Sequence, residues 1–127
     1  MKDLPTGNND AYVLIHQLQG SAVLTIVGHT VQLEAGDMVV LDAAKPSDFS
    51  FLSAPHQVSI CLPREIVEKT YPTRPGIVGR KMSGNTHFGS VVGSFVNELS
   101  TLLNSPKNEV DAMHRALLAL LKPLLST

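Results

Sequence analysis

The stretch that decides the fold runs from Tyr12 to Pro63 and contains YVLIHQLQG (12–20), SAVLTIV (21–27), GHTVQLE (28–34), AGDMVVLD (35–42), DFSFL (48–52) and QVSICLP (57–63). Each piece is a short, largely apolar run, and tight-turn residues separate the pieces. Several short strands at this spacing indicate an antiparallel sandwich or barrel. Beyond Pro63 the apolar residues recur at helical spacing, so the chain changes from strands to helices.

Two turns are predicted among the first strands. Gly20-Ser21 is expected to reverse the chain, and Gly28-His29 is expected to form a two-residue hairpin turn with glycine in the first position. The first three strands should then be joined by short antiparallel connections. The segment Ala22 to Val27 is apolar on both alternating faces, so we expect both faces of that strand to be covered.

The second half of the chain is predicted to be helical. Segment 63–84 should form a short helix that begins at Pro63, followed by a Pro- and Gly-rich connector. Segment 85–125 holds two apolar stripes with intervals of three and four residues, separated by Asn104-Ser105-Pro106. The stripes are Phe88, Val92, Phe95, Leu99 and Leu102, then Val110, Met113, Leu117, Leu120 and Leu124. They predict an antiparallel helical hairpin, in which Pro123 should kink or end the second helix.

Composition limits the class of protein. The 127 residues are predicted to form a single domain, 1–127, with a β part at 11–62. Ten basic and eleven acidic side chains give a net charge of −1, which argues against direct nucleic-acid binding by this chain. The lone Cys61 excludes an internal disulfide, and no apolar run approaches the ~20 residues of a membrane helix. These features predict a soluble, cytoplasmic protein without membrane association.

Ordered motifs in this sequence carry a family resemblance. The run GSAVLTIVGHTVQLEAGDMVVLDAAKP (20–46), the later FSF and CLPRE, and the GRKMSG segment with the helices behind it occur in a characteristic order. In this order they resemble the cupin-type N-terminal domain of AraC/XylS-family transcriptional regulators. The resemblance implies an α+β fold, with a cupin-like antiparallel β-sandwich or barrel followed by the helical hairpin. It covers nearly the whole chain.

The chain departs from that family pattern in two places. Family members have further strands upstream, whereas this chain enters the matching region near residue 11, so its sheet is expected to lack N-terminal strands or to leave an open edge. The regulators also continue into a DNA-binding region with two helix-turn-helix units, and no such segment follows Leu125. The chain is therefore expected to be either a fragment of a regulator or a stand-alone sensor.

The resemblance implies that the β part binds a small-molecule effector and that the helices form a homodimer. From the residues alone, the helical stripes could pack on the chain's own sheet or on another copy. The dimer interface implied by the resemblance consists of Phe88, Val92, Phe95, Leu99, Leu102, Val110, Met113, Leu117 and Leu120. The ligand candidates are polar or aromatic side chains on otherwise apolar strands. They are His16, Thr25, Phe49, Phe51, His56 and Cys61.

No catalytic or metal-binding constellation is predicted. The five histidines are widely separated, and no glutamate follows any of them at the ligand spacing of a metal-dependent cupin. There is no G-x-S-x-G elbow, and Cys61 on a strand is more typical of a small buried residue than of a thiolate. We therefore expect a non-enzyme without a metal or other cofactor. Two alternatives stay open: a small stand-alone cupin enzyme, either an isomerase or an oxygenase, and a pure dimerisation module without a ligand.

Overall fold

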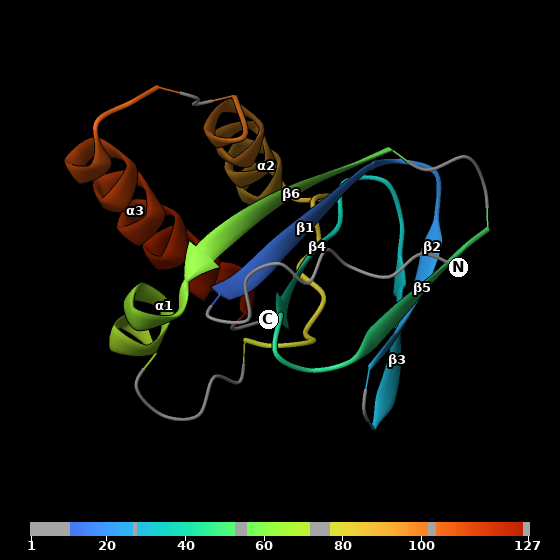
Figure 1. Ribbon diagram of the computed structural model, residues 1–127. Helices are drawn as coiled ribbons and strands as arrows, with labels where there is room; N and C mark the ends of the chain where they lie inside the picture. The colour runs from blue at the N-terminus through green and yellow to red at the C-terminus, as the bar shows by residue number, and fades with distance from the viewer. Residues whose placement is uncertain (1–10, 27, 53–55, 72–76, 102–103, 126–127) are drawn as a thin grey trace.

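The computed structural model describes residues 11–26, 28–52, 56–71, 77–101 and 104–125. Within these residues the chain forms two antiparallel three-stranded sheets and three α-helices. The three helices lie on one side of the first sheet, and the second sheet lies on the other side (Figure 1). The predicted antiparallel sandwich followed by helices is confirmed.

The first sheet has the order β4-β1-β6 and the second has the order β3-β2-β5. The strands of the first sheet are β4 (Met38–Asp42), β1 (Ala11–Gln19) and β6 (His56–Pro63). Those of the second sheet are β3 (His29–Leu33), β2 (Ala22–Ile26) and β5 (Ser47–Phe51). The helices are α1 (Arg64–Thr70), α2 (His87–Leu99) and α3 (Lys107–Leu125).

The position of strand β1 in the fold explains why its sequence is apolar without alternation. All residues from Ala11 to Gln17 are buried, because β1 is the central strand of a sheet that is covered on both faces. Tyr12 and Leu14 belong to the core shared with the helices, whereas Val13 and Ile15 belong to the core between the two sheets. One strand therefore contributes to both cores.

The connections after β1 and β2 differ from the predicted turns. Strand β1 pairs with β4 and β6 while β2 pairs with β3 and β5, so the chain crosses from one sheet to the other at Gly20-Ser21 and forms no hairpin there. The predicted hairpin between β2 and β3 exists, but Ile26 pairs with His29, which is the first residue of β3. The turn lies one residue earlier than expected, with Gly28 at a φ of +95°.

Strand β2 is covered on one face only. Ala22 and Leu24 are fully buried between the sheets, whereas Thr25 is exposed on the opposite face. The expectation that both faces would be covered is wrong, because the helices pack against the first sheet rather than the second. Strand β3 alternates in the same way, with Val31 and Leu33 inward and Gln32 exposed between them.

Helix α2 buries only part of the predicted apolar stripe. Its buried side consists of Gly89, Val92, Gly93, Val96 and Leu99. Phe88 at the start of the predicted stripe is 38% exposed. A Cβ atom at Gly93 would lie 3.1 Å from His16 Cε1 of β1, and one at Gly89 would clash with the Ser83 carbonyl oxygen, so the two glycines let α2 pack closely on β1 and on the segment before the helix. Leu102 lies outside the described residues.

The ends of the helices were partly predictable. Thr86 caps α2 by accepting a hydrogen bond from the Gly89 amide at 2.9 Å. Helix α3 continues through Pro123 to Leu125, so of the two predicted alternatives, a kink or an end before Pro123, the end is wrong. A proline so close to the end of a helix removes one hydrogen bond but interrupts no following turn. Leu117, Leu118 and Leu121 of this helix are fully buried.

Candidate functional site

A cavity of about 370 Å³ opens at one end of the sandwich. Both sheets, the β4–β5 loop and the connector after α1 contribute to its wall. It is lined by Ile26, His29, Leu41, Asp42, Lys45, Pro46, Ser47 and Val78. The mouth of a β-barrel is one of the usual places for a small-molecule site, and this volume lies in the range of such sites.

The register of the second sheet builds one wall of this cavity, which we call the mouth pocket. Ile26 pairs with His29 on one side and with Ser47 on the other, so these three residues form a row across the end of the sheet. Leu41 belongs to the core between the sheets and comes from the end of β4. The pocket is thus the open end of the inter-sheet core.

The connector between α1 and α2 closes the side of the mouth pocket. Val78 forms a bridge with Val40 of β4, and the Gly79 amide donates to the Val40 carbonyl at 2.8 Å. His29 Nε2 lies 3.2 Å from the Gly79 carbonyl oxygen, which can only accept, so the ring donates through Nε2. A Cβ atom at Gly79 would lie 2.5 Å from Ile26 Cδ1, and its φ of +78° also favours glycine. Residues 77–82 thus contact β4 through two isolated bridges, Val78 with Val40 and Met82 with Met38, which a turn at Gly79 separates.

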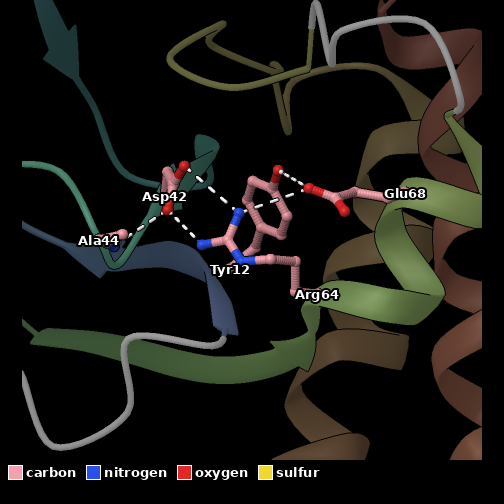
Figure 2. Close-up of polar contacts among 5 residues, drawn as sticks. All are labelled: Tyr12, Asp42, Ala44, Arg64 and Glu68. Atoms are coloured by element: carbon pink, nitrogen blue, oxygen red, sulfur yellow. Dashed lines mark hydrogen bonds and ion pairs between the residues drawn. The ribbon is translucent and has the colours of Figure 1, made fainter.

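Asp42 links the mouth pocket to α1 (Figure 2). Its Oδ1 accepts from Arg64 Nη2 at 2.6 Å and from the Ala44 amide at 2.9 Å. Burial alone would raise the pKa of Asp42, but the hydrogen bonds from Arg64 and from the Ala44 amide outweigh burial, and its pKa is lowered. Asp42 is therefore a carboxylate whose charge Arg64 already balances.

Arg64 also contacts the first strand and its own helix. Its guanidinium carbon lies 4.5 Å from the centre of the Tyr12 ring, which is a cation–π distance. The Tyr12 hydroxyl donates to Glu68 Oε2 at 3.0 Å (Figure 2). Burial, followed by this hydrogen bond, raises the pKa of Tyr12. The contacts among these three side chains and Asp42 fix the position of α1 relative to β1 and β4.

The C-terminal end of α1 is held by α3. The Tyr71 hydroxyl donates to the Leu118 carbonyl at 2.7 Å, and Lys122 Nζ lies 5.6 Å from the centre of the Tyr71 ring. Burial raises the pKa of Tyr71 to about 12. A chain of direct contacts therefore leads from Asp42 in the pocket, through α1, to the middle of α3.

A second, smaller hollow of about 210 Å³ lies where α2 crosses the first sheet. His16 is 5% exposed and lines it, and His16 Nδ1 lies 3.1 Å from Asn97 Oδ1. Burial lowers the pKa of His16, although the hydrogen bond with Asn97 opposes the shift. The remaining lining is Gly36, Gly84, Gly89, Ser90, Gly93 and Ser94. This hollow is polar and rich in glycine, whereas the mouth pocket combines an apolar wall with charged groups.

The six predicted ligand residues do not lie in one cavity. His16 faces α2, Thr25 lies on the outer face of the second sheet, and Phe49 is buried between the sheets. The ring of Phe51 stacks on that of Phe49 with centroids 5.8 Å apart. His56 and Cys61 are exposed on β6. The assignment of these residues to a ligand site stays a prediction, and none of them lines the mouth pocket.

The residues of the mouth pocket were missed for identifiable reasons. His29 was assigned to a turn, and Asp42 was explained by strand-end chemistry. Lys45, Pro46 and Ser47 were assigned to a loop. The signal that could have identified them is their shared position at strand ends, since β2, β3, β4 and β5 all begin or end at this mouth.

Most of the predicted dimer residues contribute to the chain's own core. Val92 and Leu117 are fully buried, and Leu99 is 8% exposed. Phe95, Val110, Met113 and Leu120 are half-buried, and Phe88 is exposed. Helix α2 also exposes Val91, which was not predicted.

Two further properties of the described residues bear on function. Among them, no group of three or more His, Cys, Asp or Glu side chains is placed to hold a metal ion. In the same part of the chain, no helix combines the length and the apolar character needed to cross a membrane.

The fold and its pocket define a small cupin-like sandwich with an attached helical layer, and comparison with known proteins identifies the family. The sequence model of the AraC-binding-like domain matches residues 3–126, and the chain belongs to this family. Among solved structures, the chain is similar to the AraC-like transcriptional activator CuxR, with a TM-score of 0.72 and 13% sequence identity. The match covers 93% of this chain and 43% of that activator. The resemblance to the N-terminal domain of AraC-type regulators is confirmed, and the chain spans less than half the length of the similar activator.

Proposed function

We propose that the chain is the effector-sensing domain of an AraC-type transcriptional regulator and that the mouth pocket is its effector site. The observation that carries this proposal is that one cavity is lined by both sheets and contains Asp42, which is bonded to α1. A ligand in this cavity would contact a side chain whose partner belongs to the helical layer. The cavity favours this proposal over a dimerisation module without a ligand.

A matched pair of variants on β2 tests the site. Ile26→Trp places a bulky ring at the wall of the mouth pocket, whereas Thr25→Trp places the same ring on the exposed outer face of the same strand. We expect ligands found in a thermal-shift screen of small acids, amines and sugars to lose their effect on Ile26→Trp and keep it on Thr25→Trp. Equal retention by both variants would exclude the mouth pocket as the site.

We also propose how binding is transmitted to the helices. A ligand that displaces Asp42 or changes its hydrogen bonds would disturb Arg64 and thereby the position of α1. The hydrogen bond from Tyr71 to the Leu118 carbonyl extends this effect to α3. Such coupling requires that the ligand bind one arrangement of α1 more tightly than another. Arg64→Met should therefore reduce the change in α3 that a saturating concentration of ligand produces, measured by hydrogen exchange.

We further propose that the chain forms a homodimer through the accessible side of α2. Phe88 and Val91 are 38% and 54% exposed, and Phe95 continues the same face four residues later. Large apolar side chains that recur at helical spacing on a surface are typical of interaction sites. Leu99 is a poor place to test this dimer, since a charge there would disrupt the chain's own core.

Two exposed apolar residues give a controlled test of the dimer. Val91→Asp should convert a dimer to a monomer at micromolar concentration in analytical ultracentrifugation. Leu52→Asp removes a similarly exposed apolar residue, 59% accessible and next to β5, and should leave the dimer intact. A wild-type monomer, or equal loss of dimer in both variants, would contradict an interface on α2.

A further inference from the structure

The charged groups around the mouth pocket indicate the kind of ligand that it accepts, and this inference rests on the pocket being the effector site. Two lining residues carry a formal charge, Asp42 and Lys45. The side chain of Asp42 is 11% exposed, and Arg64 forms an ion pair with it at 2.6 Å. The Ala44 amide occupies the same oxygen. The Asp42 carboxylate is therefore already satisfied and offers little to a cationic ligand.

Lys45 differs from Asp42 in having no such partner. It is exposed on the loop between β4 and β5, and no carboxylate in the described part of the chain lies within ion-pair distance of its ammonium group. The backbone of Lys45 is fixed, because its amide donates to the Asp42 carbonyl at 3.0 Å. The rim of the pocket thus presents a positive charge that forms no ion pair with a described carboxylate, although Lys45 contributes to the lowered pKa of nearby Asp42.

The other lining groups divide into a polar rim and an apolar wall. Ser47 supplies a hydroxyl group, and its strand starts directly after Pro46. Ile26, Leu41 and Val78 supply aliphatic surface from the two sheets and the connector. Ligand sites of this kind hold the body of a ligand by apolar contact and fix its orientation through a few polar groups.

We propose that the mouth pocket binds a small organic acid, with the carboxylate at Lys45 and the hydrocarbon body against Ile26, Leu41 and Val78. An ionised carboxylate forms a charge-assisted hydrogen bond with a lysine ammonium group, which is stronger than a bond between neutral groups. An amine of the same shape would instead meet the positive charge of Lys45, while Arg64 holds the Asp42 carboxylate. The acid should therefore bind more tightly than the neutral or cationic analogue.

Two sets of ligands with matched shapes test this class. Hexanoate, hexanamide and hexylamine form one set, and phenylacetate, phenylacetamide and phenethylamine form the other. Isothermal titration calorimetry at neutral pH and low salt should give the tightest binding for the acid of at least one set. Lys45→Met should weaken binding of that acid about tenfold, the usual size of one lost charge-assisted contact. Lys69→Met removes the same charge from an exposed site on α1 and should leave the affinity unchanged.

The outcomes separate the ligand class from the function of the pocket. If an amide or amine binds most tightly and Ile26→Trp abolishes its binding, the organic acid is excluded and the mouth pocket stands as the effector site. If the acid binds equally well to wild type, Lys45→Met and Ile26→Trp, it binds elsewhere and the proposed class is overturned. If no member of either set binds at millimolar concentration, the result counts against both the class and the pocket.

Discussion

The two faces of the first sheet carry two different cores. The face toward the helices is packed by large, fully buried side chains, among them Val40, Leu62 and Leu118. The face toward the second sheet carries a smaller core around Leu24 and Phe49, and this core opens at one end into the mouth pocket. The difference indicates that the helical core supplies most of the buried apolar surface, whereas the inter-sheet core leaves space for a ligand.

The polar groups show a similar difference between the helical side and the mouth pocket. On the helical side, the hydroxyl of Tyr71 is bonded to the Leu118 carbonyl, and His16 is bonded to Asn97. At the pocket, Lys45 remains exposed at the rim. Asp42 lies at the boundary, since it lines the pocket and is bonded to the first residue of α1. Asp42 is therefore in contact with both regions, as the proposed transmission from the pocket to the helices requires.

The largest effect is expected from a cavity in the helical core. Leu118→Ala should lower the free energy of unfolding by about 2–5 kcal/mol, because it removes buried apolar contacts and leaves a cavity that the neighbouring side chains fill only in part. Ile26→Ala, at the half-buried wall of the pocket, should cost less and should change ligand affinity more. Urea denaturation gives both stabilities. Equal costs would mean that Ile26 belongs to a closed core and that the two regions do not differ as described.

A substitution at the connector tests whether it seals the pocket. Gly79→Ala and Gly28→Ala both place a side chain at positive φ, which costs about 1–2 kcal/mol in each. Only Gly79→Ala also creates a clash, with Ile26, so overpacking should add roughly 1–3 kcal/mol in that variant. Thermal denaturation of the two variants isolates the clash from the backbone strain. Equal losses of stability in the two variants would show that Gly79 does not pack closely against Ile26.

The Asp42–Arg64 pair should stabilise the fold in a pH-dependent way. Arg64→Met leaves the Asp42 carboxylate without its main partner and should cost about 1–3 kcal/mol at pH 7. The pKa of Asp42 in the fold lies below the ordinary value of 3.8, so this stabilisation is present above that pH and is lost as the pH falls through the folded pKa. The difference between wild type and Arg64→Met should therefore shrink in acid. Lys69→Met is the control, and a constant difference at all pH values would contradict the assignment.

The smallest expected effect is the contribution of His16 to acid sensitivity. Burial lowers its pKa below 6.5, so the unfolded chain binds a proton more readily and stability falls as the pH drops below that value. Replacing His16 with Asn should reduce this loss, measured as unfolding free energy between pH 7 and pH 5. His56→Asn changes an exposed histidine and serves as the matched control. Identical slopes for the two variants would exclude a role for the burial of His16.

The sequence predicted where the strands and helices lie better than which elements they pair with or pack against. All six strand segments were found because short apolar runs and turn residues are local signals. The crossing at Gly20-Ser21 was missed, since a short connection between facing sheets has the same local chemistry as a hairpin. On α2, the apolar stripe predicted Val92 and Leu99, but a count of apolar residues could not show that Gly89 and Gly93 would define the buried face.

The mouth pocket was not predictable for a similar reason. Its residues come from the ends of four strands, a loop and a connector, and no pattern along the chain links Ile26 to Val78. The predicted ligand residues were chosen as polar or aromatic positions within strands. His16 does lie on a buried strand, but α2 covers the face to which it points. Assembly of the two sheets, rather than any local motif, creates the pocket.

The most direct test of the account is an NMR titration that compares the two hollows. The protein is labelled with nitrogen-15, and the tightest ligand of the matched sets is added while amide shifts are followed. We predict that the largest shifts occur around Ile26 and His29, at Lys45 and Ser47, and at Val78. Largest shifts at His16, Ser90, Ser94 and Asn97 would instead place the ligand in the hollow under α2 and would contradict the assignment of binding to the open end of the inter-sheet core.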